Sequence, residues 1–79
     1  MNDTQTKAAT QLKKALNACA KAGLQGGIYE GTFCVWPITA RSPHEINDSG
    51  ETDFYTAVEA QCEGKQIHCK MHIDGGNGW

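Results

Sequence analysis

The spacing of hydrophobic and polar positions predicts a helix near the start of the chain. Between Thr4 and Ala22, apolar residues recur every three or four positions, and lysines occupy the opposite side. The apolar stripe consists of Ala8, Leu12, Ala15, Leu16, Cys19 and Ala22. Gly23 can adopt the left-handed conformation that often follows a helix. The pattern therefore predicts an amphipathic helix over about residues 4–22.

Residues 28–36 are rich in β-branched and aromatic side chains, which predicts a strand. In a regular strand, Ile28 would point to the opposite face from Phe33 and Val35. A bulge at Gly31 would add one residue and bring all three side chains to the same face. Pro37 ends this strand. The following segment, 37–52, has little periodicity and several turn-forming residues, so we expect a long loop there.

The clearest alternation lies between residues 53 and 73 and predicts a β-hairpin. The apolar positions of its first strand are Phe54, Val58, Ala60 and Cys62, and those of its second strand are Ile67, Cys69, Met71 and Ile73. A two-residue turn at Gly64-Lys65 suits a tight hairpin. It places Met71 opposite Val58 in the core. We therefore expect strands over about 54–62 and 67–73, followed by a flexible glycine-rich tail over 74–79.

These elements predict an α+β fold in a single small domain spanning residues 1–79. One N-terminal amphipathic helix would pack on a three-stranded antiparallel sheet, in the order α-β-β-β. A chain of 79 residues is long enough for one such domain and too short for two.

Charge is distributed unevenly along the chain. Residues 1–26 carry four lysines and one acid, a net charge of +3. Residues 27–79 carry eight acids and three bases, a net charge of −5. Six of the acids follow one another without an intervening lysine or arginine: Glu45, Asp48, Glu51, Asp53, Glu59 and Glu63. This run predicts an acidic surface that steers towards a basic partner.

The sequence offers little support for metal or thiol chemistry. The four cysteines form no Cys-x-x-Cys motif, and we expect free thiols in a cytoplasmic protein because the N-terminus lacks a signal-peptide pattern. His68 and His72 would lie about 13 Å apart on a strand, too far to share one zinc ion. We expect no metal and no cofactor. A small cysteine- or histidine-dependent enzyme using Cys34, or a metal-dependent regulator, is the alternative.

We therefore expect a non-enzymatic protein-binding or inhibitor protein with no catalytic residues. The candidate contact residues are Trp36, Glu45, Asp48, Glu51, Asp53, Tyr55, Glu59 and Trp79, and Gln61, His68, Lys70 and His72 would extend the same outer sheet face. The partner would be a protein with a basic surface, such as a nucleic-acid-binding complex. Direct contact with nucleic acid is not expected, because the basic helix has neither arginine nor aromatic residues.

In size and charge, the chain resembles accessory proteins of phages and mobile elements, such as anti-CRISPR proteins. This resemblance implies a role in binding host machinery. No apolar run is long enough to span a membrane, so no membrane partner is expected. A homodimeric module that pairs the edges of its sheet is a further alternative.

Overall fold

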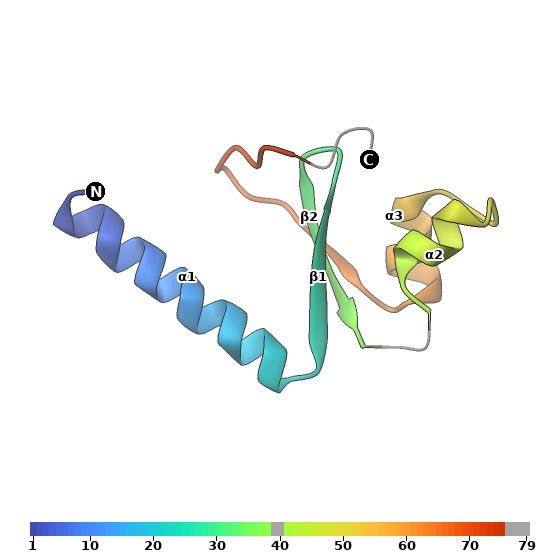
Figure 1. The fold of residues 1–79 in the computed structure, drawn as a ribbon, viewed down its shortest axis with the longest axis horizontal. Coiled ribbons are helices and arrows are strands. Elements are labelled where there is room, and N and C mark those ends of the chain that lie inside the picture. Colours follow the sequence, from blue (N-terminus) through green and yellow to red (C-terminus); the bar gives the residue numbers. More distant parts are fainter. Residues whose placement is uncertain (39–40, 76–79) are drawn as a thin grey trace.

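The structure, a computed structural model, describes residues 1–38 and 41–75. The predicted α+β class is confirmed: an N-terminal helix precedes a three-stranded antiparallel sheet (Figure 1). Helix α1 (Asp3–Lys21) leads into strands β1 (Leu24–Tyr29) and β2 (Thr32–Pro37). Helix α2 (Pro43–Asp48), helix α3 (Phe54–Thr56) and the π-helical turn η1 (Ala57–Gln61) follow, before strand β3 (Lys65–Ile67).

Helix α1 begins with a capping box that the sequence analysis did not identify. The Asn2 side chain accepts a hydrogen bond from the Gln5 amide at 2.8 Å, and the Gln5 side chain accepts one from the Asn2 amide at 2.9 Å. Two otherwise unpaired amides of the first turn are thereby satisfied. The helix ends as predicted before Gly23, whose φ of 82° lies in the left-handed region.

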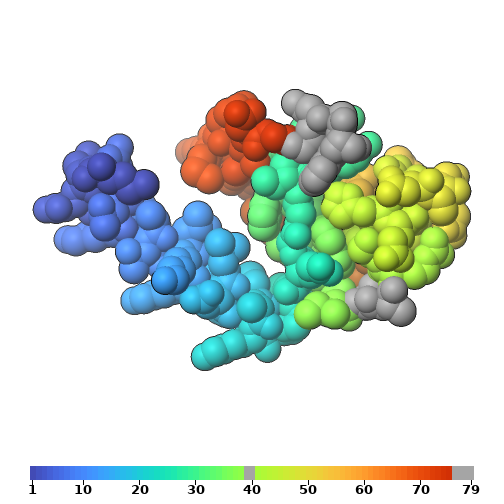
Figure 2. All heavy atoms as spheres, viewed as in Figure 1, coloured from blue at the N-terminus to red at the C-terminus, as the bar shows by residue number. Residues whose placement is uncertain are grey.

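The expected packing of α1 on the sheet is wrong. No residue of α1 is buried, and Leu12 and Leu16 of its apolar stripe are 51% and 45% exposed. Figure 1 shows α1 leaving the lower end of β1 and pointing away from the rest of the molecule. In Figure 2 it forms an arm with open space between its N-terminal half and the body.

The single strand predicted over 28–36 is instead a hairpin. Strands β1 and β2 pair antiparallel, from Leu24 opposite Pro37 to Tyr29 opposite Thr32. The supposed bulge at Gly31 is part of a two-residue turn, in which Glu30 and Gly31 have φ values of 49° and 79°. Two consecutive positive φ angles match the twist of the flanking strands, which is why such turns connect hairpins.

Gly26 and Gly27, which have low strand propensity and provide no side-chain pattern for β1, make room for aromatic side chains. A Cβ on Gly26 would lie 2.9 Å from Phe33 Cζ, and a Cβ on Gly27 would lie 2.8 Å from Trp36 Cη2. Both distances are too short for real contacts, so the aromatic rings on β2 lie across the bare backbone of β1. A close side-chain approach therefore explains a strand of low intrinsic β-propensity.

The hairpin predicted over 53–73 is also wrong. The segment predicted as its first strand, 54–62, is helical over 54–61. Of its predicted second strand, 67–73, only Ile67 belongs to a strand, β3, which pairs with β2. Asp53 caps the helical segment, since its carboxylate accepts hydrogen bonds from the Thr56 amide and hydroxyl, both at 2.9 Å. Met71, expected in the core, is 63% exposed.

Part of the expected loop over 37–52 is helical as well. Ser42 caps α2 by accepting a hydrogen bond from the Glu45 amide at 3.3 Å, and Pro43 occupies the first turn. Proline is well suited to that position because it has no amide hydrogen to leave unpaired.

The core lies between one face of the sheet and the layer formed by α2, α3 and η1 (Figure 1). It consists of Cys34, Trp36, Ile46, Phe54, Ala57, Val58 and Cys62, with Tyr29 and Tyr55 packed against it. Cys34 and Trp36 point to this side of β2, so the neighbouring positions Phe33 and Val35 point to the opposite side.

Candidate functional site

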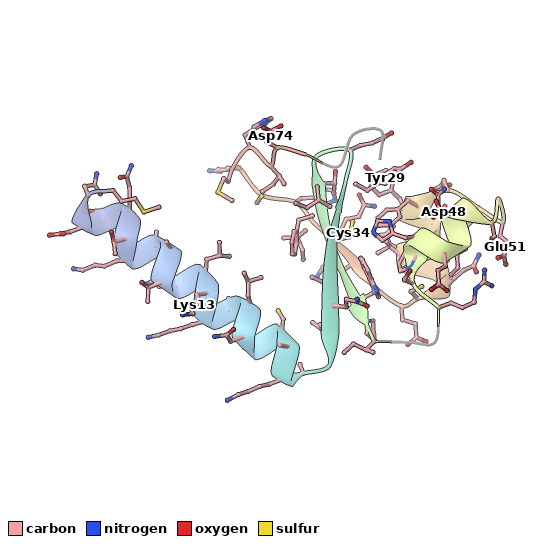
Figure 3. All side chains as sticks on the ribbon, viewed as in Figure 1. Lys13, Tyr29, Cys34, Asp48, Glu51 and Asp74 are labelled. Atoms are coloured by element: carbon pink, nitrogen blue, oxygen red, sulfur yellow. The ribbon has the colours of Figure 1, made fainter. Side chains whose placement is uncertain are left out.

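The predicted acidic run lies on helix α2 and the turn η1 and in the segments that adjoin them. All six acids are exposed: Glu45, Asp48, Glu51, Asp53, Glu59 and Glu63. Figure 3 places Asp48 and Glu51 at the α2 end of the molecule and Lys13 halfway along α1. The molecule is 46 Å long, so its positive and negative parts are separated along its length.

Two of these acids already have partners within the protein. Glu51 forms an ion pair with Arg41 and accepts a hydrogen bond from the Ser49 hydroxyl at 2.6 Å. The Arg41 hydrogen bond, with that of Ser49, lowers the pKa of Glu51 to about 2. Hydrogen bonds from the Thr56 amide and hydroxyl lower the pKa of Asp53. These two carboxylates therefore organise the layer, and Glu45, Asp48 and Glu59 are better candidates for partner contact.

The aromatic candidates are distributed differently from the acids. Trp36 is only 2% exposed, so it stabilises the core and presents no surface to a partner. Tyr55 is half-buried and donates a hydrogen bond from its hydroxyl to the Tyr29 carbonyl oxygen at 3.1 Å. Trp79 lies outside the described residues.

A hollow of about 410 Å³ adjoins the acidic layer and is lined by Tyr29, His44, Asn47 and Asp48. Figure 3 shows Tyr29 and Asp48 close together in the view at the α2 end of the molecule. The Tyr29 ring is held by stacking on Phe54, with ring centroids 4.6 Å apart. The hollow therefore combines a carboxylate, an amide, an imidazole and a fixed aromatic ring. This is a suitable lining for the side chain of a lysine or arginine from another protein.

Tyr29, His44 and Asn47 were missed as site residues by the sequence analysis. His44 and Asn47 were assigned to an irregular loop, although Ser42-Pro43 followed by Glu45 is a helix-start signal. Tyr29 was assigned near the start of a strand over 28–36, whereas it ends β1 and precedes the turn of the β1–β2 hairpin.

The other residues expected on an outer sheet face do not lie on one. Gln61 belongs to η1, and His68, Lys70 and His72 follow β3 in a segment without regular structure. All four are exposed. The predicted face does not form, because the segment predicted as its first strand is helical and β3 ends at Ile67, where the predicted second strand would begin.

Two of the four cysteines, Cys34 and Cys62, lie in environments that disfavour the thiolate. All four are unpaired, and Cys34 and Cys62 are buried. Burial raises the pKa of the Cys34 thiol, and the Glu59 carboxylate raises it further. Burial also raises the pKa of the Cys62 thiol. Since the thiolate is the nucleophilic form, both environments disfavour thiol catalysis.

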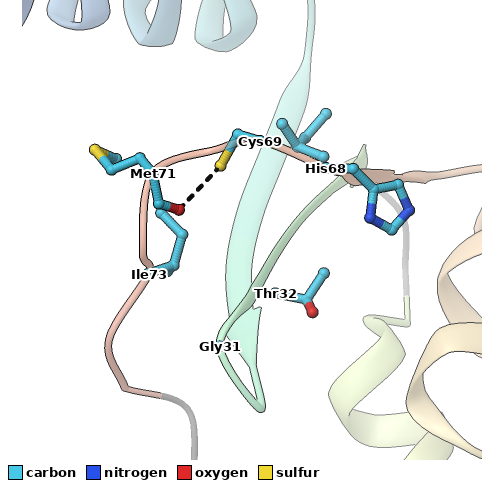
Figure 4. A pocket seen from close by; sticks show the side chains of 7 residues that line it. Gly31, Thr32, His68, Cys69, Met71 and Ile73 are labelled. Atoms are coloured by element: carbon cyan, nitrogen blue, oxygen red, sulfur yellow. Dashed lines mark hydrogen bonds between the residues drawn. The ribbon is translucent and has the colours of Figure 1, made fainter.

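A second hollow lies beside the segment that follows β3 (Figure 4). It measures about 130 Å³, and the Cys69 thiol donates a hydrogen bond to the Met71 carbonyl oxygen at 3.5 Å on one side of it. Ligand sites usually occupy about 300–1,000 Å³. This hollow is too small to be a convincing ligand site. Across residues 1–38 and 41–75, no three histidine, cysteine or acidic residues are grouped so that they would hold a metal ion.

No family model, curated protein or solved structure matches the chain. Within the part of the chain that the structure describes, no helix combines the length and apolar character needed to cross a membrane. Any functional conclusion therefore depends on the site itself.

Proposed function

We propose that this protein is a non-enzymatic binding protein whose acidic layer, made of α2, α3 and η1, docks on a basic protein surface. The observation that carries the proposal is the arrangement of the acids. Six carboxylates from 19 consecutive positions are exposed on α2 and η1 and in the segments beside them, and the four lysines of the N-terminal segment all lie on α1. An acidic surface of this kind accelerates encounter with a basic partner.

The hollow beside Asp48 gives this surface a specific contact. A partner lysine or arginine inserted there would place its charge near the Asp48 carboxylate and its apolar stem or guanidinium plane against Tyr29. Charge would then determine how fast the partner arrives, while the hollow would slow its departure.

The partner class we propose is a protein complex that binds nucleic acid, because such proteins expose basic surfaces. The acidic layer would occupy the position of the phosphate backbone. A phage or mobile-element inhibitor of the anti-CRISPR type would act in this way.

The test compares two sets of charge reversals as bait in lysate from the source cell. In the first, Glu45, Asp48 and Glu59 are changed to lysine, which leaves the Glu51 ion pair and the Asp53 cap intact. In the matched control, Lys7, Lys13 and Lys14 on α1 are changed to glutamate. We expect the first set to lose a partner that the wild type and the control retain. Capture that survives the first set and disappears with the control would refute the proposal.

The captured partner then allows a kinetic test. The association rate constant should fall at least about tenfold between 0.01 M and 0.15 M salt, because the Debye length shrinks from about 30 Å to about 8 Å. Asp48→Asn should mainly raise the dissociation rate if the hollow receives a basic side chain. Added nucleic acid should compete for the same partner, and binding that is insensitive to nucleic acid would exclude the proposed partner class.

A further inference from the structure

The protein exposes more surface than a compact monomer of its mass. Its solvent-accessible surface is 5798 Å², whereas a folded monomer of 8.6 kDa has about 4,700 Å². Its radius of gyration is 14.0 Å, against about 11.6 Å for a compact chain of this length. The excess surface is roughly 1,100 Å², which is comparable to the area of about 800 Å² that each partner buries in a standard interface.

Two separate apolar surfaces remain at least partly exposed in this extended molecule. One is the apolar stripe of α1, which includes Leu12, Leu16 and Cys19. The other is the sheet face turned away from the core, which we call the uncovered sheet face; its large apolar residues are Leu24, Ile28, Phe33, Val35 and Ile67, and the register also places Gly26, Pro37 and Lys65 on it. Leu12, Leu16 and Ile67 are exposed. The remaining members, Cys19, Leu24, Ile28, Phe33 and Val35, are half-buried within one chain.

The uncovered sheet face suits a helix in size and composition. Pairing places Ile28 beside Phe33 and Phe33 beside Ile67, so an apolar row crosses all three strands. Helix α1 has 19 residues and is about 28 Å long, while a six-residue strand is about 20 Å long. One helix of this length therefore spans the face. In Figure 1, α1 lies on the opposite side of the sheet from α2 and α3.

The connection between α1 and β1 opposes closure of the helix onto its own sheet. Only Ala22 and Gly23 separate the two elements. The Gly23 amide donates to the Ala20 carbonyl oxygen at 3.1 Å, and the Gly23 carbonyl oxygen accepts from the Ile38 amide at 2.9 Å. The connector is thus hydrogen-bonded to the helix on one side and to the end of β2 on the other. Packing α1 on the sheet of its own chain would break these hydrogen bonds. Short connectors of this kind favour exchange of an element between chains.

We propose that α1 of one copy packs on the uncovered sheet face of a second copy, and that the exchange is reciprocal. A two-fold dimer of this kind covers both apolar surfaces of both chains with one type of contact. It also brings the N-terminal segment, with its net charge of +3, to the remainder of another chain, with its net charge of −5. The contact uses a sheet face and a helix, not the strand edges, and it leaves the acidic layer on the other side of each sheet accessible.

The first experiment measures the mass of the full-length chain by light scattering after size-exclusion chromatography. We expect twice 8.6 kDa for the wild type at micromolar concentrations. Leu12→Asp combined with Leu16→Asp should raise the dimer dissociation constant by at least about 100-fold, since two apolar anchors per interface are lost. Thr10→Asp combined with Asn17→Asp adds the same charge at two exposed positions on the opposite side of α1; this matched control should remain dimeric.

Both leucines are about half exposed within one chain, so their replacement should leave the melting temperature of the isolated chain nearly unchanged. A wild type that stays monomeric overturns the proposal and leaves a foreign partner as the occupant of the face. A dimer that survives the two aspartates overturns it as well, because the contact must then lie elsewhere.

The second experiment identifies the surface that receives the helix. A photoreactive p-benzoylphenylalanine replaces Leu16, and isotopically light and heavy chains are mixed before illumination. We expect mixed-isotope products joined to β1, β2 or β3 of the other copy. Products joined to the strands of the same chain would show that α1 closes on its own sheet, and products joined to α1 of the other copy would show a helix–helix dimer. Either result overturns the exchange.

Discussion

Replacing Ala57 and Ala60, one at a time, with glutamine tests whether residues 54–61 are helical, as in the structure, or form the strand that the sequence predicted. In the helical segment 54–61, Ala57 is 0% exposed and Ala60 is exposed. A strand over 54–62 would reverse this, because Ala60 would share the inward side with Phe54 while Ala57 would point outwards. The two positions carry the same native residue, and glutamine adds no charge, so the comparison isolates burial.

The expected magnitudes follow from the packing. At Ala57, forcing a longer side chain into a filled core lowers the free energy of unfolding by about 1–3 kcal/mol. Burying the side-chain amide of glutamine without a hydrogen-bond partner lowers it by about 1–3 kcal/mol more. The total of about 2–6 kcal/mol corresponds to a fall in melting temperature of at least about 10 °C for a domain of this size. At Ala60, only the lower helix propensity of glutamine counts, which costs less than about 0.7 kcal/mol.

The assay is thermal and urea unfolding followed by circular dichroism, at concentrations where both variants have the same oligomeric state. The free energy of unfolding should fall strongly for Ala57→Gln and hardly at all for Ala60→Gln. The reverse ranking would refute the helical segment and restore the hairpin predicted from the sequence. Equal effects at both positions would show that neither arrangement describes this part of the core.

Three further predictions concern the rest of the fold. Gly64→Ala should lower the free energy of unfolding by about 2 kcal/mol or more, because its Cβ would overlap the Val35 carbonyl oxygen; an unchanged urea midpoint would contradict this packing. Glu51→Gln should remove a stabilising contribution that the wild type has above about pH 4.5 and loses as pH falls towards about 2, since the Arg41 ion pair lowers the pKa of Glu51. Identical pH–stability curves for the two proteins would exclude this. Met71→Asp should change the melting temperature little because Met71 is 63% exposed; unfolding would favour the original hairpin.

The failed hairpin has a definite physical origin. Phe54, Val58 and Cys62 are spaced four residues apart, which puts them on one side of a strand and also on one face of a helix. All three are buried in the structure, so the pattern identified core residues correctly while leaving the type of element open. The position that discriminates is Ala57, which is too small and too weakly hydrophobic to mark a face on its own.

The candidate site was predictable in its charge and not in its shape. The acids could be identified because a run of acidic residues without lysine or arginine is a property of the sequence and does not depend on the fold. Their common layer exists because Ser42 and Asp53 start two helical segments, and both cap signals are present in the sequence. The hollow beside Asp48 could not be predicted, because Tyr29 reaches it only through pairing and packing of segments distant in sequence.

By itself, the sequence determined the features that depend on near neighbours. These are the helix ending before Gly23, whose backbone freedom permits the stop, the separation of positive and negative charge, and the three buried positions Phe54, Val58 and Cys62. Tertiary structure decided the features that depend on contacts between distant segments. Strand β1 forms across Gly26 and Gly27 only because aromatic rings on β2 occupy the space above them. The core likewise lies on the side of the sheet covered by α2, α3 and η1, because their bulky side chains bury Cys34 and Trp36 there while the short connector at Gly23 directs α1 away.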